Sequence, residues 1–443
     1  MNLINLIGCI NEIGKRQKAD NISGLLREPS LEEYVSSKSK NNITGYFMQI
    51  GIDDFEEING RFGLKCGDEI LKQFSRCMQS CINENQKIYE LGNGRFIIMD
   101  LANHTKEDIL ELYDELKKSV EVALEESDYR IVYTISVGIV EIDKEMKDYD
   151  TLIKYSEFAL NEAKKKGKNS CYFFTQDKYK QFIRRREIRV GLQNAVDHNF
   201  NNFDVYYQPI IDIHTRNLIG AEALMRFKMK RNEQIEFVSP AEFIPILEES
   251  GLIIPTGRWI LRQAVACCKK WQEFIPEFKV NVNLSYVQII KSRILDEIKQ
   301  ALKDYNLKPA LLGIEVTESG YLENTYHYKK LWSSLKEEGI TLVLDDYGTG
   351  YSNAYRLSNL TPHYIKIDRV LTQKALSSNY ERSILIYIIE MAHSLKLNVC
   401  IEGVETEEEL QEIKKLNPDY IQGYLFGKPA PEDEFYNRQI KKK

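Results

Sequence analysis

Polar side chains that can take part in chemistry recur in the second half of the chain, each at or near the carboxyl end of a short apolar segment. The set comprises Glu222, Asn283, Glu315, Asp345, Asp346, Lys366, Asp368, Glu402 and Gln422. Any single acid of this set could simply cap the helix that follows its strand. Because nearly every strand end carries such a group while the strand interiors stay apolar, the whole set predicts one shared site.

The chemistry of this set points to metal ions. Crowded carboxylates repel one another strongly in a barrel mouth unless cations neutralise them. Carboxylate and amide oxygens, with no cysteine or histidine at these strand ends, favour Mg²⁺ or Mn²⁺ over zinc. The adjacent pair Asp345 and Asp346 suits two ions, and two ions stabilise both the attacking and the leaving oxygen of a displacement at phosphorus. The pattern therefore predicts phosphodiester hydrolysis.

Two features near the acids have a second interpretation. Lys366 could orient or deprotonate the attacking water or stabilise phosphate charge, or it could be a surface lysine after a strand. The stretch DDYGTGYS, 345–352, could be a plain turn or an active-site loop that cradles a phosphate. Its position directly after the aspartate pair favours the loop.

Eight strand-like segments in this half alternate with mostly helical stretches, which predicts a (β/α)₈ barrel over residues 200–443. The connection IIDIHTRNLIG leaves only a few turn residues between the first two strands. A parallel crossover needs more residues than that, so this pair is expected to be an antiparallel hairpin.

The first half predicts a different kind of domain. Residues 41–175 mix strands and helices in an α+β pattern, with a tight hairpin turn at Gly92-Asn93-Gly94. Residues 1–40 are expected to form a helical extension ahead of it. Residues 176–199 are helical and charged, with Arg184 to Arg186 on a solvated face, and are expected to join the two domains.

The composition excludes several classes of protein. A net charge of −6 gives no broad positive field for nucleic acid or anionic membrane. The eight cysteines show no C-x-x-C spacing, which favours reduced thiols in a cytoplasmic protein. The apolar start MNLINLIGCI lacks the length of a membrane span.

The motifs YQP, EALMRF, NVNLS, IEVTES, LDDYGTGYS, IKID, IEGVET and IQGYLFG, between Tyr207 and Gly427, resemble the EAL domains that hydrolyse cyclic di-GMP to pGpG. The resemblance implies a catalytic role for Lys366, as the residue that acts on the water, and for the acids Glu222, Asp345, Asp346 and Glu402. It implies that two Mg²⁺ or Mn²⁺ ions are held by Glu222, Asn283, Glu315, Asp345, Asp346 and Glu402. Substrate contacts are expected from Gln208, Arg226, Asp368 and Gln422. Glu318 would anchor the loop after Asp346, and the one departure is Tyr347, where the family often has phenylalanine.

The first half resembles a GGDEF domain, the partner that usually makes cyclic di-GMP from GTP, through ISGLLRE, IDDFEEINGRFGLKCGD and LNEAKKKGKN. Its signature reads GNGRF, so the metal-binding acids of that family fall on Gly51 and Gly94, and synthesis should fail. The inhibitory site falls on Asn83 and Gln86 and is also missing.

Residues that would hold GTP in a GGDEF domain are retained. They are Asn59, Asp68, Lys164 and Lys168. They indicate either a regulatory GTP site or residues that now only support the fold, with Asp68 capping a helix.

The sequence therefore leaves three hypotheses for the whole chain: a phosphodiesterase, a non-catalytic cyclic di-GMP receptor and a cyclase. The complete set of metal ligands favours the first. The resemblance further implies a homodimer formed through the EAL domain.

Overall fold

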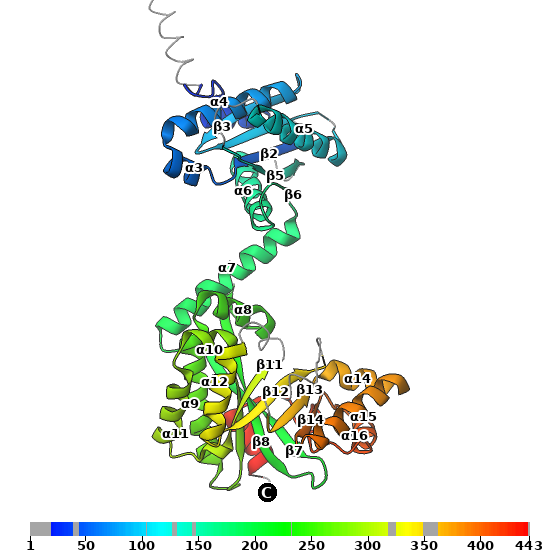
Figure 1. The fold of residues 1–443 in the computed structure, drawn as a ribbon. Helices are drawn as coiled ribbons and strands as arrows, with labels where there is room; N and C mark the ends of the chain where they lie inside the picture. Colours follow the sequence, from blue (N-terminus) through cyan, green and yellow to red (C-terminus); the bar gives the residue numbers. More distant parts are fainter. Residues whose placement is uncertain are drawn as a thin grey trace, which may run out of the picture. The chain divides into compact units, whose positions relative to one another are not determined.

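The computed structural model describes residues 19–38, 44–102, 104–125, 131–143, 148–231, 233–317, 325–348 and 362–441. The chain divides into two compact units, Met1–Ile183 and Arg184–Lys443 (Figure 1). The helix α7 (Gln176–Asp197) spans the division.

The first unit is built on a six-stranded sheet in the order β1-β3-β4-β2-β5-β6. The strands are β1 (Leu26–Arg27), β2 (Gly45–Ile52), β3 (Gln86–Gly92), β4 (Arg95–Asp100), β5 (Ile135–Ile142) and β6 (Cys171–Phe173). The central strand β2 runs antiparallel to β4 and β5, while the outer pairs β1–β3 and β5–β6 are parallel. The predicted α+β domain is confirmed.

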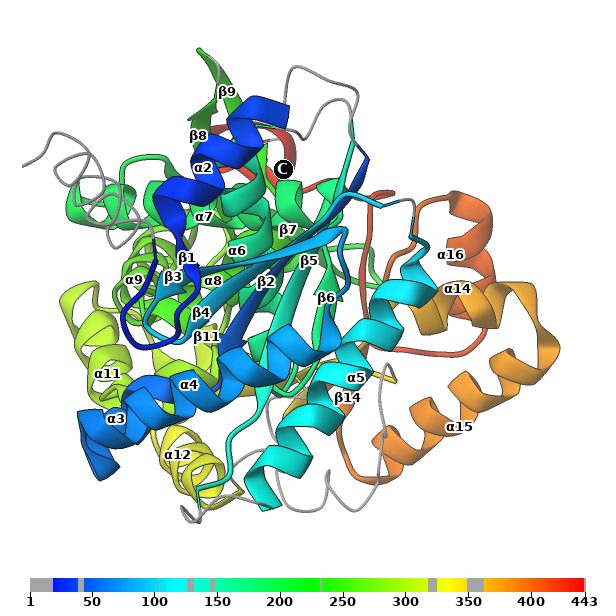
Figure 2. The same cartoon turned by 90° about the horizontal axis from the view of Figure 1, so that it is seen from above.

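Helices cover both faces of this sheet, because side chains alternate along β2. Met48 and Ile50 face one core, with α3 (Phe55–Phe62), α4 (Leu64–Cys81) and α5 (Lys106–Glu125). Phe47 faces the other core, with α2 (Glu28–Lys38) and α6 (Tyr149–Lys165). Figure 2 shows α4 and α5 lying across the same side of the strands.

The expected boundary at residue 40 does not coincide with the edge of the first unit. β1 pairs with β3, and α2 buries Leu31 and Val35 completely in the sheet core. Residues spaced i, i+4 lie on the same face of a helix, so Leu31 and Val35 can both pack against the sheet. The described residues ahead of position 40 are therefore part of this unit, and the apolar start of the chain lies outside the described residues.

The expected turn between β3 and β4 is confirmed. Gly92, Asn93 and Gly94 have φ values of 85°, 52° and 69°. Three consecutive residues in the left-handed region require glycine or asparagine, because other side chains are strained there.

The second unit is a closed barrel. Its strands are β7 (Phe203–Asp212), β8 (Leu218–Arg231), β10 (Lys279–Asn283), β11 (Leu312–Thr317), β12 (Thr341–Tyr347), β13 (Tyr364–Ile367), β14 (Asn398–Glu402) and β15 (Tyr420–Gln422). The pairings run in this order, and β15 returns to β7 to close the ring. β7 is antiparallel to both of its neighbours, as the short connection to β8 predicts.

The remaining elements surround or extend the barrel. The helices are α8 (Pro240–Ser250), α9 (Ile253–Trp271), α10 (Tyr286–Lys291), α11 (Ile294–Asp304), α12 (Thr325–Glu337), α14 (Arg369–Ser377), α15 (Asn379–Ser394), α16 (Glu407–Lys414) and α17 (Glu432–Phe435). Two short strands, β9 (Gln234–Val238) and β16 (Ala430–Pro431), pair with β8 and β7. The predicted barrel is confirmed, and the acids at its strand ends meet at one mouth.

The basic run on α7 is more than a solvated face. Arg184 pairs with Glu236 at 2.7 Å and Glu242 at 3.2 Å, and Arg185 pairs with Glu249 at 2.5 Å. These ion pairs join the second half of α7 to the barrel unit.

The first half of α7 packs on the first unit through aromatic rings. Tyr179 lies edge-on to Tyr155 at 4.9 Å and to Phe158 at 5.2 Å between ring centroids. We expect Tyr179→Ala to lower the free energy of unfolding of the first unit by about 3 kcal/mol, because it leaves a cavity among these rings. Phe182→Ala is the matched control, since that ring is 37% exposed. Denaturant unfolding of the full chain measures the stability of both variants. Equal losses of stability in Tyr179→Ala and Phe182→Ala would contradict the packing role of Tyr179.

Candidate active site

A bulge in β12 presents two neighbouring acids to the same mouth. Leu344 pairs with Ile365 and Tyr347 with Ile367, so that Asp345 and Asp346 together oppose a single residue of β13. Asp346 has a φ of 56°, a left-handed conformation that aspartate tolerates better than most residues. Without the bulge, consecutive strand residues would point to opposite faces.

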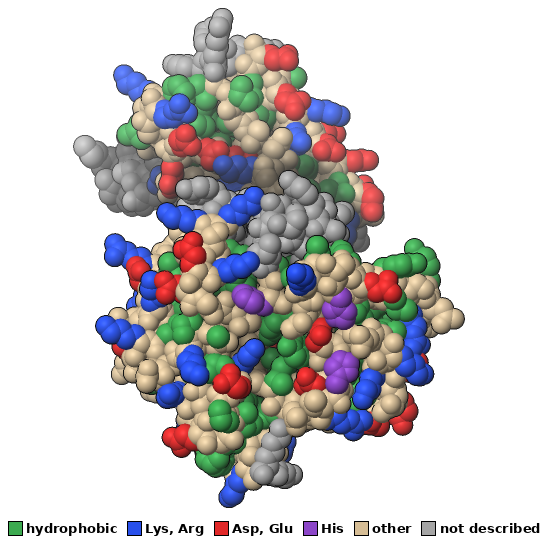
Figure 3. Space-filling model, turned by 60° about the horizontal axis from the view of Figure 1, so that its bottom comes forward, with side chains coloured by type: hydrophobic (Ala, Val, Ile, Leu, Met, Phe, Trp, Pro, Cys, Tyr) green, Lys and Arg blue, Asp and Glu red, His purple; other side chains and the backbone are tan. Residues whose placement is uncertain are grey.

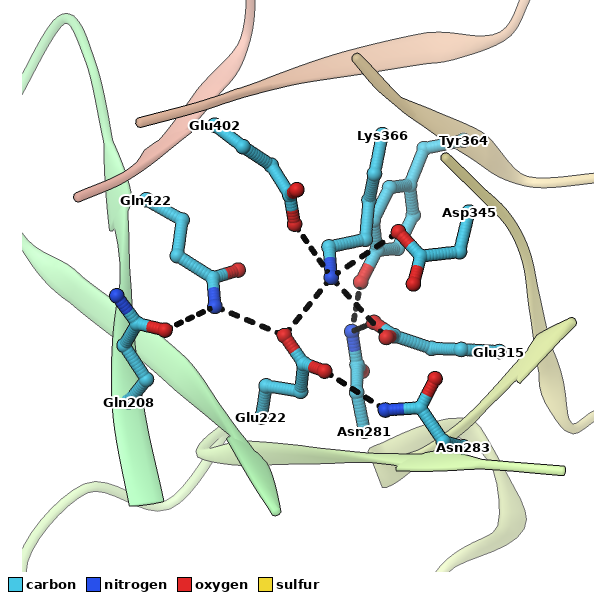
Figure 4. A network of polar contacts seen from close by, with 10 residues as sticks. All are labelled: Gln208, Glu222, Asn281, Asn283, Glu315, Asp345, Tyr364, Lys366, Glu402 and Gln422. Atoms are coloured by element: carbon cyan, nitrogen blue, oxygen red, sulfur yellow. Dashed lines mark hydrogen bonds and ion pairs between the residues drawn. The ribbon is translucent and has the colours of Figure 1, made fainter. Parts of the chain in front are cut away.

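The single residue opposite the bulge is Lys366, which is 1% exposed. Its Nζ atom lies at the centre of the acids (Figure 4). It is 2.7 Å from Glu402, 2.8 Å from Glu222, 3.1 Å from Glu315 and 3.3 Å from Asp345. One ammonium group therefore holds four carboxylates from four different strands.

Amide side chains orient the central carboxylate of Glu222. Asn283 donates to its Oε1 at 2.7 Å, and Gln422 donates to its Oε2 at 2.8 Å. Gln422 also donates to Gln208 at 3.0 Å. The barrel register explains these contacts, because Gln208 pairs with Glu222 and Glu402 pairs with Gln422 on adjacent strands.

The charges of the mouth are not balanced by protein groups alone. Burial raises the pKa of Glu315 well above its usual value, and neighbouring Glu222 adds to the rise. Burial likewise raises the pKa of Asp346 to about 6 and that of Glu402 to about 8. Glu222 is the exception. Burial alone would raise its pKa, but the charge of Lys366 and the hydrogen bonds from the amide donors have a larger effect and lower its pKa.

The acids form two groups that fit divalent cations. Oxygens of Glu222, Glu315 and Asp345 lie within 4.8 Å of one another, as do those of Asp345, Asp346 and Glu402. Asp345 belongs to both groups. Five carboxylates against one ammonium group leave four negative charges, which two divalent ions would balance. The raised pKa values and the all-oxygen donor set fit hard cations.

Two cavities open on either side of the aspartate pair. The smaller has a volume of about 300 Å³ and is lined by Glu222, Lys366 and Glu402 among others. The larger, of about 740 Å³, is lined by Arg226 and Asn283 together with apolar side chains of α8 and α9. Asp345 and Asp346 line both, so an elongated ligand can cross the acids and occupy each side.

The structure brings most of the predicted site residues of the barrel together and places Asp368 differently. Asp368 caps α14 by accepting from Val370 N–H at 2.7 Å, and it is not among the residues lining either cavity. Glu318 lies outside the described residues, as does most of the glycine-rich loop.

Sequence reasoning missed two buried residues beneath the acids. Asn281 donates to Glu315 at 2.6 Å and also to the hydroxyl group of Tyr364. Asn281 and Tyr364 each precede a predicted site residue by two positions on a strand. The two-residue period of strands puts such pairs on the same side, and this signal could have identified them.

In the first unit, Gly51 and Gly94, where the resemblance places the family's metal-binding acids, are surrounded by other side chains. A Cβ atom at Gly51 would lie 3.1 Å from Nζ of Lys164, and one at Gly94 would lie 2.8 Å from the ring of Phe55. A side chain at position 94 therefore requires Phe55 to move.

The retained residues of the first unit have mixed environments. Lys168 pairs with Asp54 at 2.7 Å, whereas Oδ1 of Asn59 is buried without a hydrogen-bond partner. Asn59 packs against Gly67, next to the partly buried Asp68 at the start of α4. At the expected inhibitory site, Gln86 accepts from the backbone N–H of Asn83 and donates to the buried Asp100.

Comparison with known families identifies both units. Residues 189–429, more than half of the chain, match the EAL domain. The chain belongs to the EAL family. Residues 18–170 match the diguanylate cyclase GGDEF domain, so a GGDEF domain precedes the EAL domain. The resemblance read from the motifs is confirmed.

Individual relatives match most of the length of this chain. The chain is 32% identical over 399 residues to the signaling protein YkoW of Bacillus subtilis, covering 89% of this chain and 48% of that protein. It is 28% identical over 435 residues to the cyclic di-GMP phosphodiesterase PdeR of Escherichia coli, covering 96% of this chain and 64% of that protein. The chain thus spans about half to two thirds of the length of these relatives.

A solved structure also resembles the EAL domain. The structure titled "PaMucR Phosphodiesterase, c-di-GMP complex" matches with a TM-score of 0.53 and 28% identity, covering 56% of this chain and 99% of that chain. No helix in the described part of this chain is long and apolar enough to cross a membrane. The cytoplasmic location, the homodimer and the absence of a nucleic-acid partner stay predictions.

The ion network around Lys366 makes a prediction about stability. We expect Lys366→Met to destabilise the EAL domain by about 3–5 kcal/mol in EDTA, because four buried carboxylates lose their cation. Added Mg²⁺ should raise the unfolding temperature of this variant more than that of the wild type. Lys270→Met, which removes an exposed pair with Glu432 at 2.7 Å, is the control and should change little. Thermal unfolding measures both variants. Equal losses of stability in Lys366→Met and Lys270→Met would contradict a stabilising role of the network around Lys366.

Proposed function

We propose that the EAL domain hydrolyses cyclic di-GMP to pGpG in a reaction that depends on Mg²⁺ or Mn²⁺. The observation that carries this proposal is the convergence of four carboxylates on Lys366, with Asp346 beside them, between two cavities. A dinucleotide with two phosphodiester groups suits a mouth in which acids separate two hollows.

Relatives support the same substrate. PdeR is named a cyclic di-GMP phosphodiesterase, and the PaMucR structure is titled a phosphodiesterase in complex with c-di-GMP. Both share 28% identity with this chain. Their names support the proposal through the shared EAL domain.

We assign the metal-holding role to the oxygen groups of the mouth. These are Glu222, Asn283, Glu315, Asp345, Asp346 and Glu402. Two bound ions would supply a water of lowered pKa and would neutralise charge on the phosphate. Lys366 is positioned to orient the attacking water, since its ammonium group lies among all of these acids.

The remaining site residues would hold the substrate. Burial lowers the pKa of Arg226, whose guanidinium lies 5.4 Å from the ring of Tyr206 on the wall of the larger cavity. A phosphate oxygen there would compensate for that burial. Gln208 and Gln422 line the smaller cavity, where Gln422 donates both to Glu222 and to Gln208.

A product assay tests this function. The wild type should form pGpG from cyclic di-GMP with Mg²⁺ or Mn²⁺, whereas Glu222→Gln and Asp345→Asn should each lower kcat by more than ~100-fold. Removing a residue that only hydrogen-bonds to a metal ligand already lowers metal affinity or activity by ~10–100-fold, so removing a ligand itself should lower activity further. Glu407→Gln, an exposed acid paired with Arg216, is the control and should keep full activity. Tight binding of cyclic di-GMP without any product would instead indicate a receptor.

We further propose that GTP bound to the GGDEF domain regulates this activity. The buried, unpartnered oxygen of Asn59 lies against Gly67, the residue before Asp68, and the side chains of Asn59 and Asp68 offer acceptors for the N–H groups of a guanine base. With glycine at position 51, Lys164 has no carboxylate there and is available to a phosphate.

This regulation has its own test. GTP should lower KM or raise kcat for cyclic di-GMP, and Asp68→Ala should remove the effect without changing basal turnover. Glu69→Ala, which removes an exposed acid paired with Lys72 on the same helix, should keep the response. If GTP changes neither parameter of the wild type, the GGDEF domain is a structural element.

A further inference from the structure

A third cavity, separate from the two beside the aspartate pair, lies at the end of the barrel opposite the acids. It has a volume of about 570 Å³, and we call it the basal cavity. Its lining includes the first residues of five strands: Lys279, Thr341, Tyr364, Asn398 and Tyr420. Asn283, Glu402 and Gln422, which belong to the acidic mouth, are the last residues of three of these strands, so the cavity and the mouth lie at opposite strand ends. The basal cavity is therefore not part of the catalytic mouth.

The charged groups that line the basal cavity all have the same sign. Lys279, Lys336 and Lys396 line it together with His363, and among the described residues no aspartate or glutamate does. Figure 3 brings this end of the molecule forward and shows histidine, lysine and arginine side chains on it, interspersed with acidic and apolar ones. In a chain of net charge −6, such a concentration of positive groups in one hollow favours a local anion.

His363 contributes a hydrogen-bond donor to the basal cavity. Its Nδ1 accepts from the backbone N–H of Leu342 at 2.9 Å, which leaves Nε2 as a hydrogen-bond donor. Burial lowers the pKa of His363, and the charges of Lys336 and Lys279 lower it further. Lys336 on α12 and Lys279 on β10 line the basal cavity together with His363.

Acids near the basal cavity are occupied by other partners. Asp419 accepts from the backbone N–H of Val399 at 2.7 Å and contacts His393 at 3.0 Å. Asp212 accepts from the backbone N–H groups of its own turn. Neither acid lines the basal cavity.

The basal cavity also has neutral polar groups and aromatic surface. Tyr364 and Tyr420 meet edge to face at 5.7 Å, and Asn398 donates to the hydroxyl of Tyr420 at 3.0 Å. Asn281, 2% exposed, lines the same hollow. A concave site with a few polar groups on apolar walls has the size and character of a small-molecule pocket.

We propose that the basal cavity binds a small phosphate-bearing molecule. Lysine ammonium groups bind phosphate as point charges, and three of them with a histidine donor can surround one phosphoryl group. The volume of the hollow limits the ligand to the size of a phosphorylated metabolite. The site goes beyond the proposed hydrolysis, because it lies at the other end of the barrel.

Calorimetric titration of the full chain in EDTA tests this site without involving hydrolysis. Inorganic pyrophosphate and glucose 6-phosphate are the two probes. The probe that binds with the higher affinity shows whether the site prefers an inorganic or an organic phosphate. We expect saturable binding to the wild type and a loss of at least ~10-fold in affinity in the double variant Lys279→Gln/Lys396→Gln.

The control is the double variant Lys270→Gln/Lys299→Gln. It removes the same charge from the same unit, at lysines paired with Glu432 and Glu338. It should bind the probes as the wild type does, and circular dichroism checks that both variants stay folded. Absence of binding to the wild type at millimolar probe would overturn the proposal, as would equal loss of affinity in the two double variants.

Discussion

The interaction on which the mouth of the EAL domain depends is the contact between one buried ammonium group and four buried carboxylates. Each carboxylate alone would be expensive to bury, and Lys366 alone would be too. Together they leave an excess of negative charge, and burial, helped by the neighbouring carboxylates, raises the pKa values of Glu315, Asp345 and Glu402. The mouth is thus pre-organised for divalent cations, because the protein supplies fewer positive charges than the acids require.

Barrel closure brings these groups to one place. Glu222 and Gln422 lie 200 positions apart in sequence, yet they are hydrogen-bonded because the antiparallel β7 links the last strand to the second. The bulge in β12 then turns two adjacent aspartates toward the same mouth. The antiparallel strand and the bulge are both departures from a regular parallel barrel, and the site uses both.

The sequence predicts the architecture well because strand ends and hairpins follow from local pattern. The turn at Gly92 to Gly94 and the β7–β8 hairpin are both confirmed. Local pattern could not reveal that Lys366 lies among four acids, since those distances depend on closure of the ring. It also misassigned residues 19–38, because a two-residue edge strand such as β1 has no periodicity to detect.

The two ends of the barrel have opposite electrostatic character. Acids gather where the strands finish, and lysines line the basal cavity where they start. Asn281 and Tyr364 connect these regions, since both line the basal cavity and Asn281 donates to Glu315. The strands thus carry one continuous polar path through an otherwise apolar interior.

A crystal structure of the full chain with cyclic di-GMP and Ca²⁺ tests the central claim most directly. The account predicts two ions, one in each of the acidic groups that share Asp345, with a phosphodiester of the ligand between them. Ions bound elsewhere, or a ligand that leaves the carboxylates in contact with Lys366 alone, would contradict it.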